Sequence, residues 1–346
     1  MTEPRAYPPP ERRPGRSAGS GAEHSAAGRT AAGKFAAVLL FSLTVFACGV
    51  FLGRSPIGLF SGNPQALSIL VTLRIPRAFL AFMVGGALAL SGAVFQAALK
   101  NPLASPYILG ISSGASLGAA LVMTLGLGFA GGFTLPAAGF VFGLGTVFLV
   151  VAVSSRLDKS LSNNTIILFG MVFSLFVNAV LTTMLSLFRE ELRNLVIWQL
   201  GSFSLKGWNY VRLMLPFLVV GFAGVYRYAK ELDILSFGEE EARAMGVQAR
   251  RVRKRLFFFS SLLTGAAVAL TGAVGFVDLI APHAARKIIG SNHRLVLPFS
   301  FFTGGALMTA ADLAARTIIS PSELPVGAVT ALIGAPFFAW IYFRKK

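Results

Sequence analysis

The sequence predicts an all-α, polytopic membrane protein with about ten transmembrane helices arranged as two inverted-repeat halves. Hydrophobic residues make up 55% and charged residues only 13% of the 346 residues, whereas soluble domains carry roughly 25% charged residues. Apolar runs long enough to cross a bilayer recur along the chain, and the basic residues lie between them. Because backbone groups in lipid must be hydrogen-bonded within their own segment, we expect these runs to be helices.

The chain starts with a polar tail. Residues 1–33 are rich in Pro, Gly, Ser, Ala and Arg and have no apolar periodicity, which predicts a disordered cytoplasmic tail. No convincing cleavage site precedes a soluble domain, so we expect the first helix to remain as an anchor. Residues 34–346 are then expected to form one transmembrane domain.

Nine apolar runs follow the tail. They cover about 35–53, 78–99, 104–126, 134–154, 163–187, 209–228, 257–275, 297–315 and 325–343. A tenth run, at about 279–290, is shorter, is interrupted by Pro282 and carries three basic or titratable side chains, His283, Arg286 and Lys287. Counting this run as a span places most of the 31 Lys and Arg residues inside. The charge asymmetry therefore predicts ten spans with both termini cytoplasmic.

An internal repeat relates the two halves. Residues 89–94, Ala-Leu-Ser-Gly-Ala-Val, match residues 269–274, Ala-Leu-Thr-Gly-Ala-Val, at an offset of 180 residues. The same offset pairs Pro102 with Pro282. In a ten-span topology the second span runs inward and the seventh outward, so the halves would be inverted repeats, a transporter architecture.

No catalytic site is indicated. The three histidines show no metal-ligand or catalytic spacing, and no Gly-x-x-x-x-Gly-Lys-Ser/Thr phosphate loop is present. We therefore expect no enzyme activity, no metal and no cofactor, and an energy source that is either an ion gradient or a separate ATPase. Nucleic-acid binding is excluded because the basic residues lie between apolar runs rather than on one soluble face.

The longest hydrophilic internal segment, at about 229–255, is a candidate coupling loop. Glu239–Met245 can form a short helix that Gly246 stops, with acidic residues near its positive end. Composition alone leaves two interpretations, a docking helix for a partner or a solvated loop whose basic run only enforces topology. The candidate coupling residues are Gly238, Glu239, Glu240, Glu241, Ala242, Arg243, Met245, Gly246 and Val247.

Many ordered motifs then resemble one family. The first half carries Arg74-Ile75-Pro76-Arg77, the glycine-rich run 85–92, Gln96, Asn101-Pro102-Leu103-Ala104 and the run 109–115. The second half carries the run 272–277, Pro282-His283, Arg286, His293-Arg294, Ala311-Asp312, Ala315-Arg316, the run 323–327 and Gly334-Ala335-Pro336. Together they resemble the permeases of iron-siderophore, haem and cobalamin ABC importers, the FecCD-type family.

That resemblance implies a homodimer bound to two cytoplasmic ATP-binding subunits, an extracytoplasmic substrate-binding protein and membrane lipid. It implies uptake of an iron chelate, haem or cobalamin-like cargo driven by ATP on the partner chains. A gradient-driven secondary transporter is the alternative, because that class also uses inverted repeats. The resemblance also favours the docking interpretation of the coupling loop.

Further roles follow from the resemblance. Arg74, Arg77 and Arg316 are candidates for docking the binding protein, since arginine pairs bidentately with carboxylates. The alternatives are snorkelling to the interface, or for Arg316 a pair with Asp312 four residues earlier. Candidates for the translocation path or for close helix crossing, with plain packing as the alternative, are Gly85, Gly86, Ser91, Gly92, Gln96, Asn101, Gly272 and Gly275.

Two further residues are singled out. Asp278 departs from the family pattern, and the sequence alone favours no single partner among a neighbouring side chain, water and cargo. His283, after Pro282, is expected to be structural rather than an iron ligand.

Overall fold

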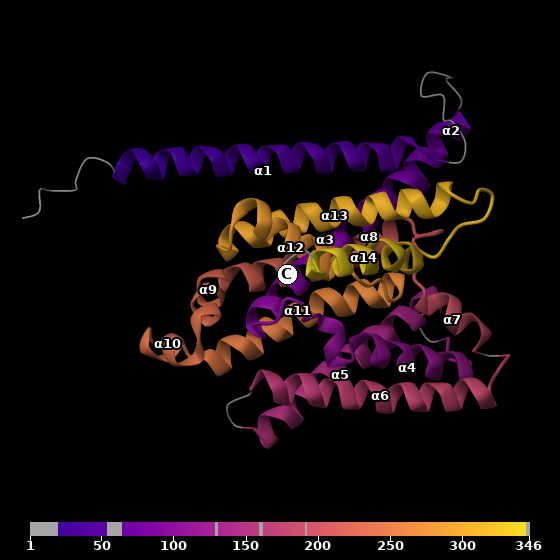
Figure 1. The fold of residues 1–346 in the computed structure, drawn as a ribbon. Coiled ribbons are helices and arrows are strands. Elements are labelled where there is room, and N and C mark those ends of the chain that lie inside the picture. Colours follow the sequence, from indigo (N-terminus) through magenta and orange to yellow (C-terminus); the bar gives the residue numbers. More distant parts are fainter. Residues whose placement is uncertain (1–19, 54–63, 129–130, 159–161, 191, 344–346) are drawn as a thin grey trace, which may run out of the picture.

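The computed structural model describes residues 20–53, 64–128, 131–158, 162–190 and 192–343, and the long helices within them lie side by side (Figure 1). The helices are α1 (Ser20–Phe51), α2 (Pro64–Ile69), α3 (Ile75–Ala98), α4 (Ile111–Thr124), α5 (Thr134–Leu157), α6 (Asn163–Leu187), α7 (Arg193–Gln199), α8 (Trp208–Arg227), α9 (Ala229–Phe237), α10 (Glu239–Ala244), α11 (Ala249–Thr271), α12 (Val277–Ile289), α13 (His293–Thr317) and α14 (Val326–Phe343). Across these ranges the regular structure is helical, which confirms the predicted fold class.

Each predicted span overlaps a helix of the structure. Six segments are long and apolar enough to cross a membrane: 32–51 in α1, 64–98 through α3, and helices α5, α6, α8 and α13. Helices α4 and α14 are apolar but shorter. Helix α11 begins with a basic stretch, and α12 has only 13 residues, yet α12 is a continuous helix despite Pro282.

Three boundaries differ from the sequence prediction. Helix α1 already begins at Ser20, because its alanine-rich start favours the helix that the apolar run continues. The third span was expected from 104, but a 3₁₀ turn, Pro106–Leu109, and Gly110 in the left-handed region (φ 79°) precede α4. The seventh was expected at 257–275, whereas α11 begins at Ala249 and ends at Thr271, where Gly272 takes φ 83°.

Helix α3 forms the centre of the molecule. Nearly all of its residues from Ala78 onward are buried, and it packs against α13, α12, α11 and α8. It crosses α13 closely where Gly85 faces Gly304 and a Cβ on either glycine would meet the backbone of the other. Small residues permit such close packing between membrane helices, where lipid supplies no hydrophobic driving force.

The two halves run in opposite directions through the molecule. Helix α3 follows α2 from one end, whereas α11 follows α10 from the other (Figure 1). Side chains also join these corresponding helices, since Ser91 Oγ donates to the Ser260 carbonyl (2.5 Å) and Thr264 Oγ1 donates to Ser91 Oγ (2.7 Å). The opposite directions agree with the predicted inverted halves.

Candidate functional site

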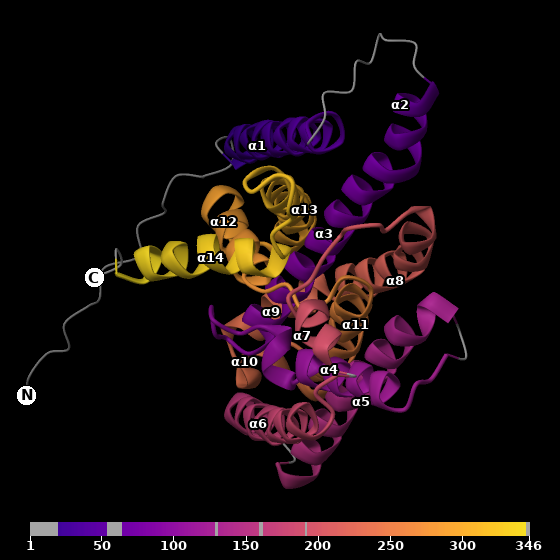
Figure 2. The same cartoon turned by 90° about the vertical axis from the view of Figure 1, so that its right-hand side faces the viewer.

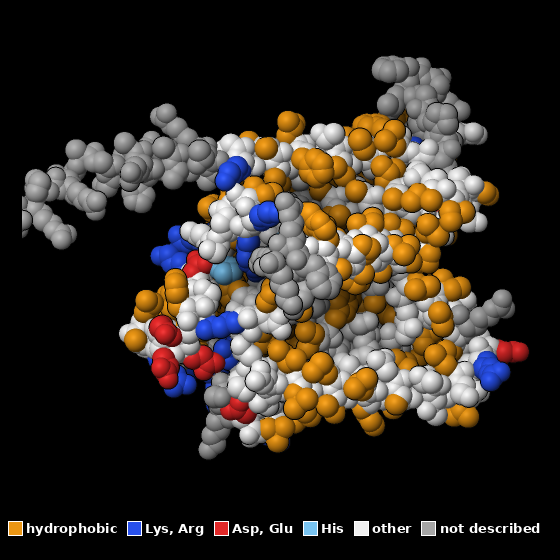
Figure 3. Space-filling model, in the orientation of Figure 1, with side chains coloured by type: hydrophobic (Ala, Val, Ile, Leu, Met, Phe, Trp, Pro, Cys, Tyr) orange, Lys and Arg blue, Asp and Glu red, His pale blue; other side chains and the backbone are white. Residues whose placement is uncertain are grey.

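Charged side chains gather at the end of the molecule that carries α9 and α10, whereas hydrophobic side chains cover much of the remaining visible surface (Figure 3). This distribution matches a membrane-embedded body with one polar end. The candidate coupling loop lies at that end.

The coupling helix begins at the predicted residue and ends one residue before the predicted Met245. Helix α10 covers Glu239–Ala244, and Gly246 follows it with φ 76°. Gly246 N donates to the Arg243 carbonyl (2.9 Å) and Val247 N donates to the Ala242 carbonyl (2.8 Å). This pair of bonds is the Schellman motif, which glycine favours because it lacks a Cβ in the left-handed region.

Helix α10 has an anchored face and a free face. Ala242 is buried, and Glu239 Oε1 lies 2.7 Å from Arg253 Nη2 of α11, whose side chain is only 3% exposed. Glu240 and Glu241 point to the surface, and Met245 is 63% exposed beside them. The short helix therefore offers acidic and apolar groups outward while one ion pair holds it to α11.

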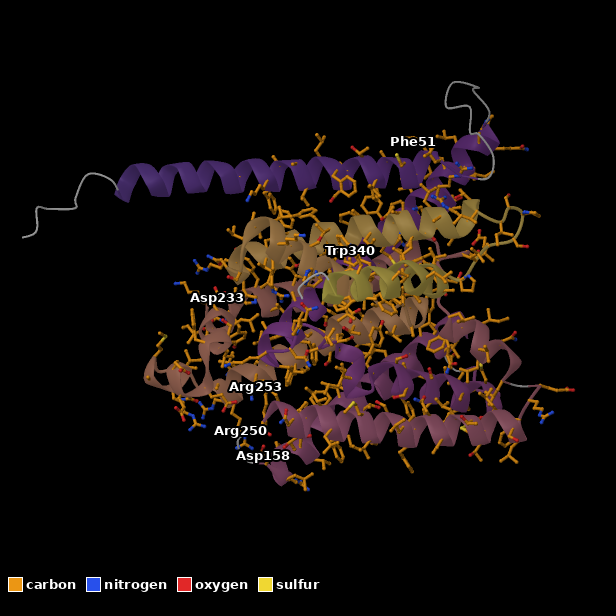
Figure 4. The ribbon with its side chains drawn as sticks, viewed as in Figure 1. Phe51, Asp158, Asp233, Arg250, Arg253 and Trp340 are labelled. Carbon is orange, nitrogen blue, oxygen red and sulfur yellow. The ribbon has the colours of Figure 1, made fainter. Side chains whose placement is uncertain are left out.

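A second contact anchors the preceding helix α9. Asp233 Oδ1 accepts hydrogen bonds from the backbone N of His293 (2.9 Å) and lies 2.6 Å from His293 Nδ1, at the start of α13. Figure 4 shows Asp233 and Arg253 at the same end of the molecule. The α9–α10 unit is thus tied to two helices, α11 and α13, that both pack on α3.

Sequence reasoning missed these two anchors. Asp233 and His293 are far apart in the chain. Arg253 was considered only as one of the basic residues of the 229–255 loop, whose charge favours a cytoplasmic location. Phe237, 73% exposed at the end of α9, was also not singled out although it extends the free face. The buried anchoring partners depend on the tertiary fold, so no local pattern marks them.

The candidate docking arginines lie at the opposite end, where Arg77 is clamped between two carboxylates. Its guanidinium donates to both oxygens of Asp312 (2.9–3.1 Å) and to both oxygens of Glu323 (3.0 and 3.1 Å). Asp312 is 2% exposed at its side chain. The bidentate geometry ties α3 to α13 and to the loop that follows α13.

Arg74 and Arg316 bind the end of α1. Arg316 Nη2 donates to the Gly49 carbonyl, and Arg74 Nη1 donates to the Phe51 carbonyl (3.3 Å). The last carbonyls of a helix lack partners and carry partial negative charge, so cations are favourable there. Arg316 also lies 3.7 Å from Asp312, the i, i+4 pair considered from the sequence.

These arginines line one pocket. It has a volume of about 350 Å³ and is also bordered by Glu323 and Lys206. Lys206 Nζ lies 4.5 Å from the centre of the Tyr210 ring, and burial lowers the pKa of Lys206 from 10.5 to about 8. No sequence motif singles out Lys206, which lies in the loop before α8.

The candidate crossing glycines fall into two groups. A Cβ at Gly85, Gly92 or Gly272 would collide with a neighbouring backbone, the Asp278 carbonyl in the case of Gly92, and Gly86 packs directly on the Phe301 ring. Gly275 has open space around it within this subunit, so no helix of the same chain crosses closely there and its assignment stays a prediction.

The polar candidates tie α3 to its neighbours. Gln96 Nε2 donates to the Asp278 carbonyl (3.3 Å), and its Oε1 accepts from Arg286. Asn101 Oδ1 accepts from Leu103 N (2.9 Å) and so shapes a turn.

Buried Asp278 accepts a hydrogen bond from Ser105 Oγ, which joins the start of α12 to the 3₁₀ turn before α4. Of the alternatives for Asp278, pairing with a neighbouring side chain is therefore the one realised.

Comparisons with known proteins agree on one family. The model of the FecCD transport family matches residues 35–344. An uncharacterized ABC transporter permease protein, YvrB of Bacillus subtilis, is 42% identical over 82% of this chain and 81% of its own. The cobalamin import system permease protein BtuC of Halobacterium salinarum is 40% identical (81% and 75%), and the hemin transport system permease protein HmuU of Yersinia pestis is 34% identical (83% and 86%).

A solved structure agrees with the fold. It is an inward-facing conformation of a metal-chelate type ABC transporter, 30% identical, with a TM-score of 0.82 over 90% of this chain and 98% of that chain. The match covers nearly the whole fold described above.

Proposed function

The chain belongs to the FecCD transport family, and from this premise we propose that it carries an iron chelate, haem or a cobalamin-like cargo inward as the permease subunit of an ABC importer. Family members are permease components of ABC transporters, and ATP hydrolysis belongs to partner subunits. The observation that carries the proposal is the family match over residues 35–344 together with the anchored coupling helix at the polar end.

The coupling role is assigned to α9 and α10. We propose that the residues from Gly238 to Val247 dock into an ATP-binding subunit through the exposed Glu240, Glu241 and Met245. The contacts of Glu239 with Arg253 and of Asp233 with His293 support a lever that passes movement to α11 and α13. A short helix held at two points transmits displacement better than a free loop.

The outer pocket is proposed to receive the substrate-binding protein. Four cations, Arg74, Arg77, Arg316 and Lys206, border it against one carboxylate, Glu323. The intramolecular bonds of the arginines fix their positions, so a carboxylate of the binding protein would meet a preorganised positive field. Lys206 adds a charge without a carboxylate partner among the described residues.

The assembly is proposed to be a homodimer with the cargo path at its seam. Large exposed apolar side chains on α6 and α14 favour a covered surface there; they include Leu168, Leu175, Phe176, Leu332 and Trp340. Within one subunit the polar candidates Ser91 and Gln96 are buried as ties between helices, which favours a path between subunits rather than through one.

The orientation follows the charge distribution. We propose a multi-pass protein of the inner membrane with the α10 end and both termini cytoplasmic, a tail over residues 1–33 and a permease domain over 34–346. The segment 1–19 lies outside the described residues, and α1 extends into the proposed tail from Ser20.

Reconstitution tests the proposal. The permease would be placed in liposomes with its ATPase and binding protein, and uptake of ferric siderophore, haem and cobalamin would be measured with ATP or with an imposed ion gradient. We expect uptake of one cargo class with ATP only. Uptake driven by the gradient without ATP would establish the secondary-transporter alternative instead.

A further inference from the structure

An apolar groove runs between α5 and α11 in the half of the molecule nearest α10. Its volume is about 200 Å³. Leu144, Val147, Phe148 and Val151 of α5 face Phe257 and Phe258 of α11 across it. The spacing of three or four residues on both helices shows that one face of each helix lines the groove, over a length of about 12 Å.

The groove has a buried floor and an open side. Val147 and Phe257 are buried, whereas Phe148 and Phe258 are exposed, with ring centres 5.9 Å apart. Nearer the outer end, Phe140 of α5 packs on Phe217 of α8 with ring centres 4.8 Å apart. The groove is therefore open on the side of Phe148 and Phe258 and floored by Val147 and Phe257.

Basic side chains surround the end nearest α10. Lys254 lines the groove there and is exposed, and no salt bridge to it is found within the described ranges. Arg251 lies one turn before Lys254 on α11, and Arg156 lies one turn beyond the groove on α5. Arg250 Nη2 donates to the Ser155 carbonyl (3.3 Å) and so bridges the two helices.

Two acids lie near these cations, and both are bound to other groups: Glu239 pairs with Arg253, and Asp158 binds the start of α6. Asp158 Oδ2 accepts from Ser162 N (3.0 Å) and Thr165 Oγ1 (3.2 Å), at the start of α6. Figure 4 shows Asp158 and Arg250 at this end of the molecule. Arg250 and Arg251 also lie in the first turn of α11, at the positive end of its dipole, where an anion rather than a cation is favourable.

We propose that the groove binds one acyl chain of an anionic phospholipid from the cytoplasmic leaflet, with the phosphate against Lys254. The inference rests on the proposed function only for the orientation that puts α10 in the cytoplasm. An apolar slot with basic groups at its aqueous end matches a lipid that carries a negative headgroup on an apolar chain. Figure 2 shows α11 between α8 and α5, whereas α14, with its exposed apolar residues, lies on the other side, so a second subunit has a separate surface.

Lipid retention by the purified permease tests the proposal. The protein in detergent would be incubated with phosphatidylglycerol or phosphatidylcholine of identical acyl chains, and native mass spectrometry would count the lipids retained. We expect preferential retention of one phosphatidylglycerol per chain. Loss of one cation near a membrane surface weakens anionic lipid binding by about fivefold, so Lys254→Gln should reduce the preference by that factor.

Matched variants distinguish lipid binding in the groove from non-specific attraction of anionic lipid to the basic surface. Lys287→Gln removes an exposed lysine at the end of α12, away from the groove, and should leave the preference unchanged. Ala152→Trp fills the groove and should reduce retention of the bound lipid, whereas Ala223→Trp, at an exposed alanine of α8, should not. Equal retention of both lipids by the wild type, or an unchanged preference in Lys254→Gln, would overturn the proposal.

A disulfide experiment tests whether a second copy of this chain, rather than a lipid, covers the groove. In a chain with Cys48→Ala, a cysteine introduced as Ala152→Cys should remain monomeric on oxidation in native membranes. A disulfide-linked dimer would mean that a second copy of the chain covers the groove and would refute lipid binding. Neither experiment needs the ATPase or cargo. A failure of the lipid proposal is therefore distinguishable from a failure of the proposed transport function.

Discussion

The ion pair between Glu239 and Arg253 gives the sharpest prediction about coupling. In Glu239→Gln the buried Arg253 guanidinium loses its carboxylate. Breaking a fully buried pair costs roughly 3–5 kcal/mol. Because Glu239 is 31% exposed, we expect about 2 kcal/mol here, which weakens the packing of α10 on α11 by about 30-fold.

The assay separates recruitment from transmission. Glu239 points toward α11 of its own chain rather than outward, so Glu239→Gln should still recruit the ATPase. The amount of cargo moved per ATP hydrolysed should fall severalfold in proteoliposomes. Glu240→Gln removes the same charge from an exposed neighbour and should weaken recruitment while cargo per ATP in assembled complexes stays near wild type. Both quantities can be measured in one preparation.

A double variant tests the physical cause. Adding Arg253→Met to Glu239→Gln removes the buried guanidinium that Glu239 would otherwise neutralise, so the melting temperature should recover towards the wild-type value. If Glu239→Gln alone kept both its melting temperature and its cargo per ATP, the anchoring argument would be refuted.

Three other perturbations have defined outcomes. Asp312→Asn leaves the half-buried Arg77 and the buried Arg316 without their shared carboxylate. It should destabilise the fold by about 3 kcal/mol and so lower the melting temperature in detergent, and an unchanged melting curve would contradict the clamp. Raising the pH from 7 to 9 crosses the lowered Lys206 pKa of about 8, removes a positive charge from the outer pocket and should weaken binding-protein affinity; Lys206→Gln should abolish most of that pH dependence, and an identical pH profile in both proteins would refute it. Gly92→Ala places a Cβ against the Asp278 carbonyl and should destabilise the fold by at least about 3 kcal/mol, whereas Gly145→Ala, with open space around it, should be tolerated, and equal melting temperatures would disprove the close crossing.

The sequence predicted those features that local patterns determine. Apolar run length located the helices, and charge asymmetry indicated that the short segment of α12 belongs to the fold. The end of α10 at Gly246 was predictable because the left-handed position after a helix favours glycine. The match of Gly92 with Gly272 also pointed correctly to two close backbone approaches.

Features that depend on distant partners were not predictable. The anchors Asp233–His293 and Glu239–Arg253 join helices that only the tertiary fold brings together. The same holds for Lys206, whose pocket is built from several separate segments. Gly275 makes no close approach within the subunit, so its assignment to the path or to a crossing stays a prediction.

The interpretation of the docking arginines also changed with the fold. Arg77 is already bonded to Asp312 and Glu323, so charge reversal there would break an internal clamp as well as any contact with a binding protein. Lys206 offers a cleaner probe, because it borders the same pocket and its charge can be removed without disrupting a buried ion pair.

The central claim is that this chain moves cargo only when a partner hydrolyses ATP. Its most direct test is uptake in proteoliposomes that contain the permease, the binding protein and either the active ATPase or a variant that binds but does not hydrolyse ATP. We predict accumulation against a gradient with the active ATPase and none with the inactive variant. Equal accumulation with both would contradict the account.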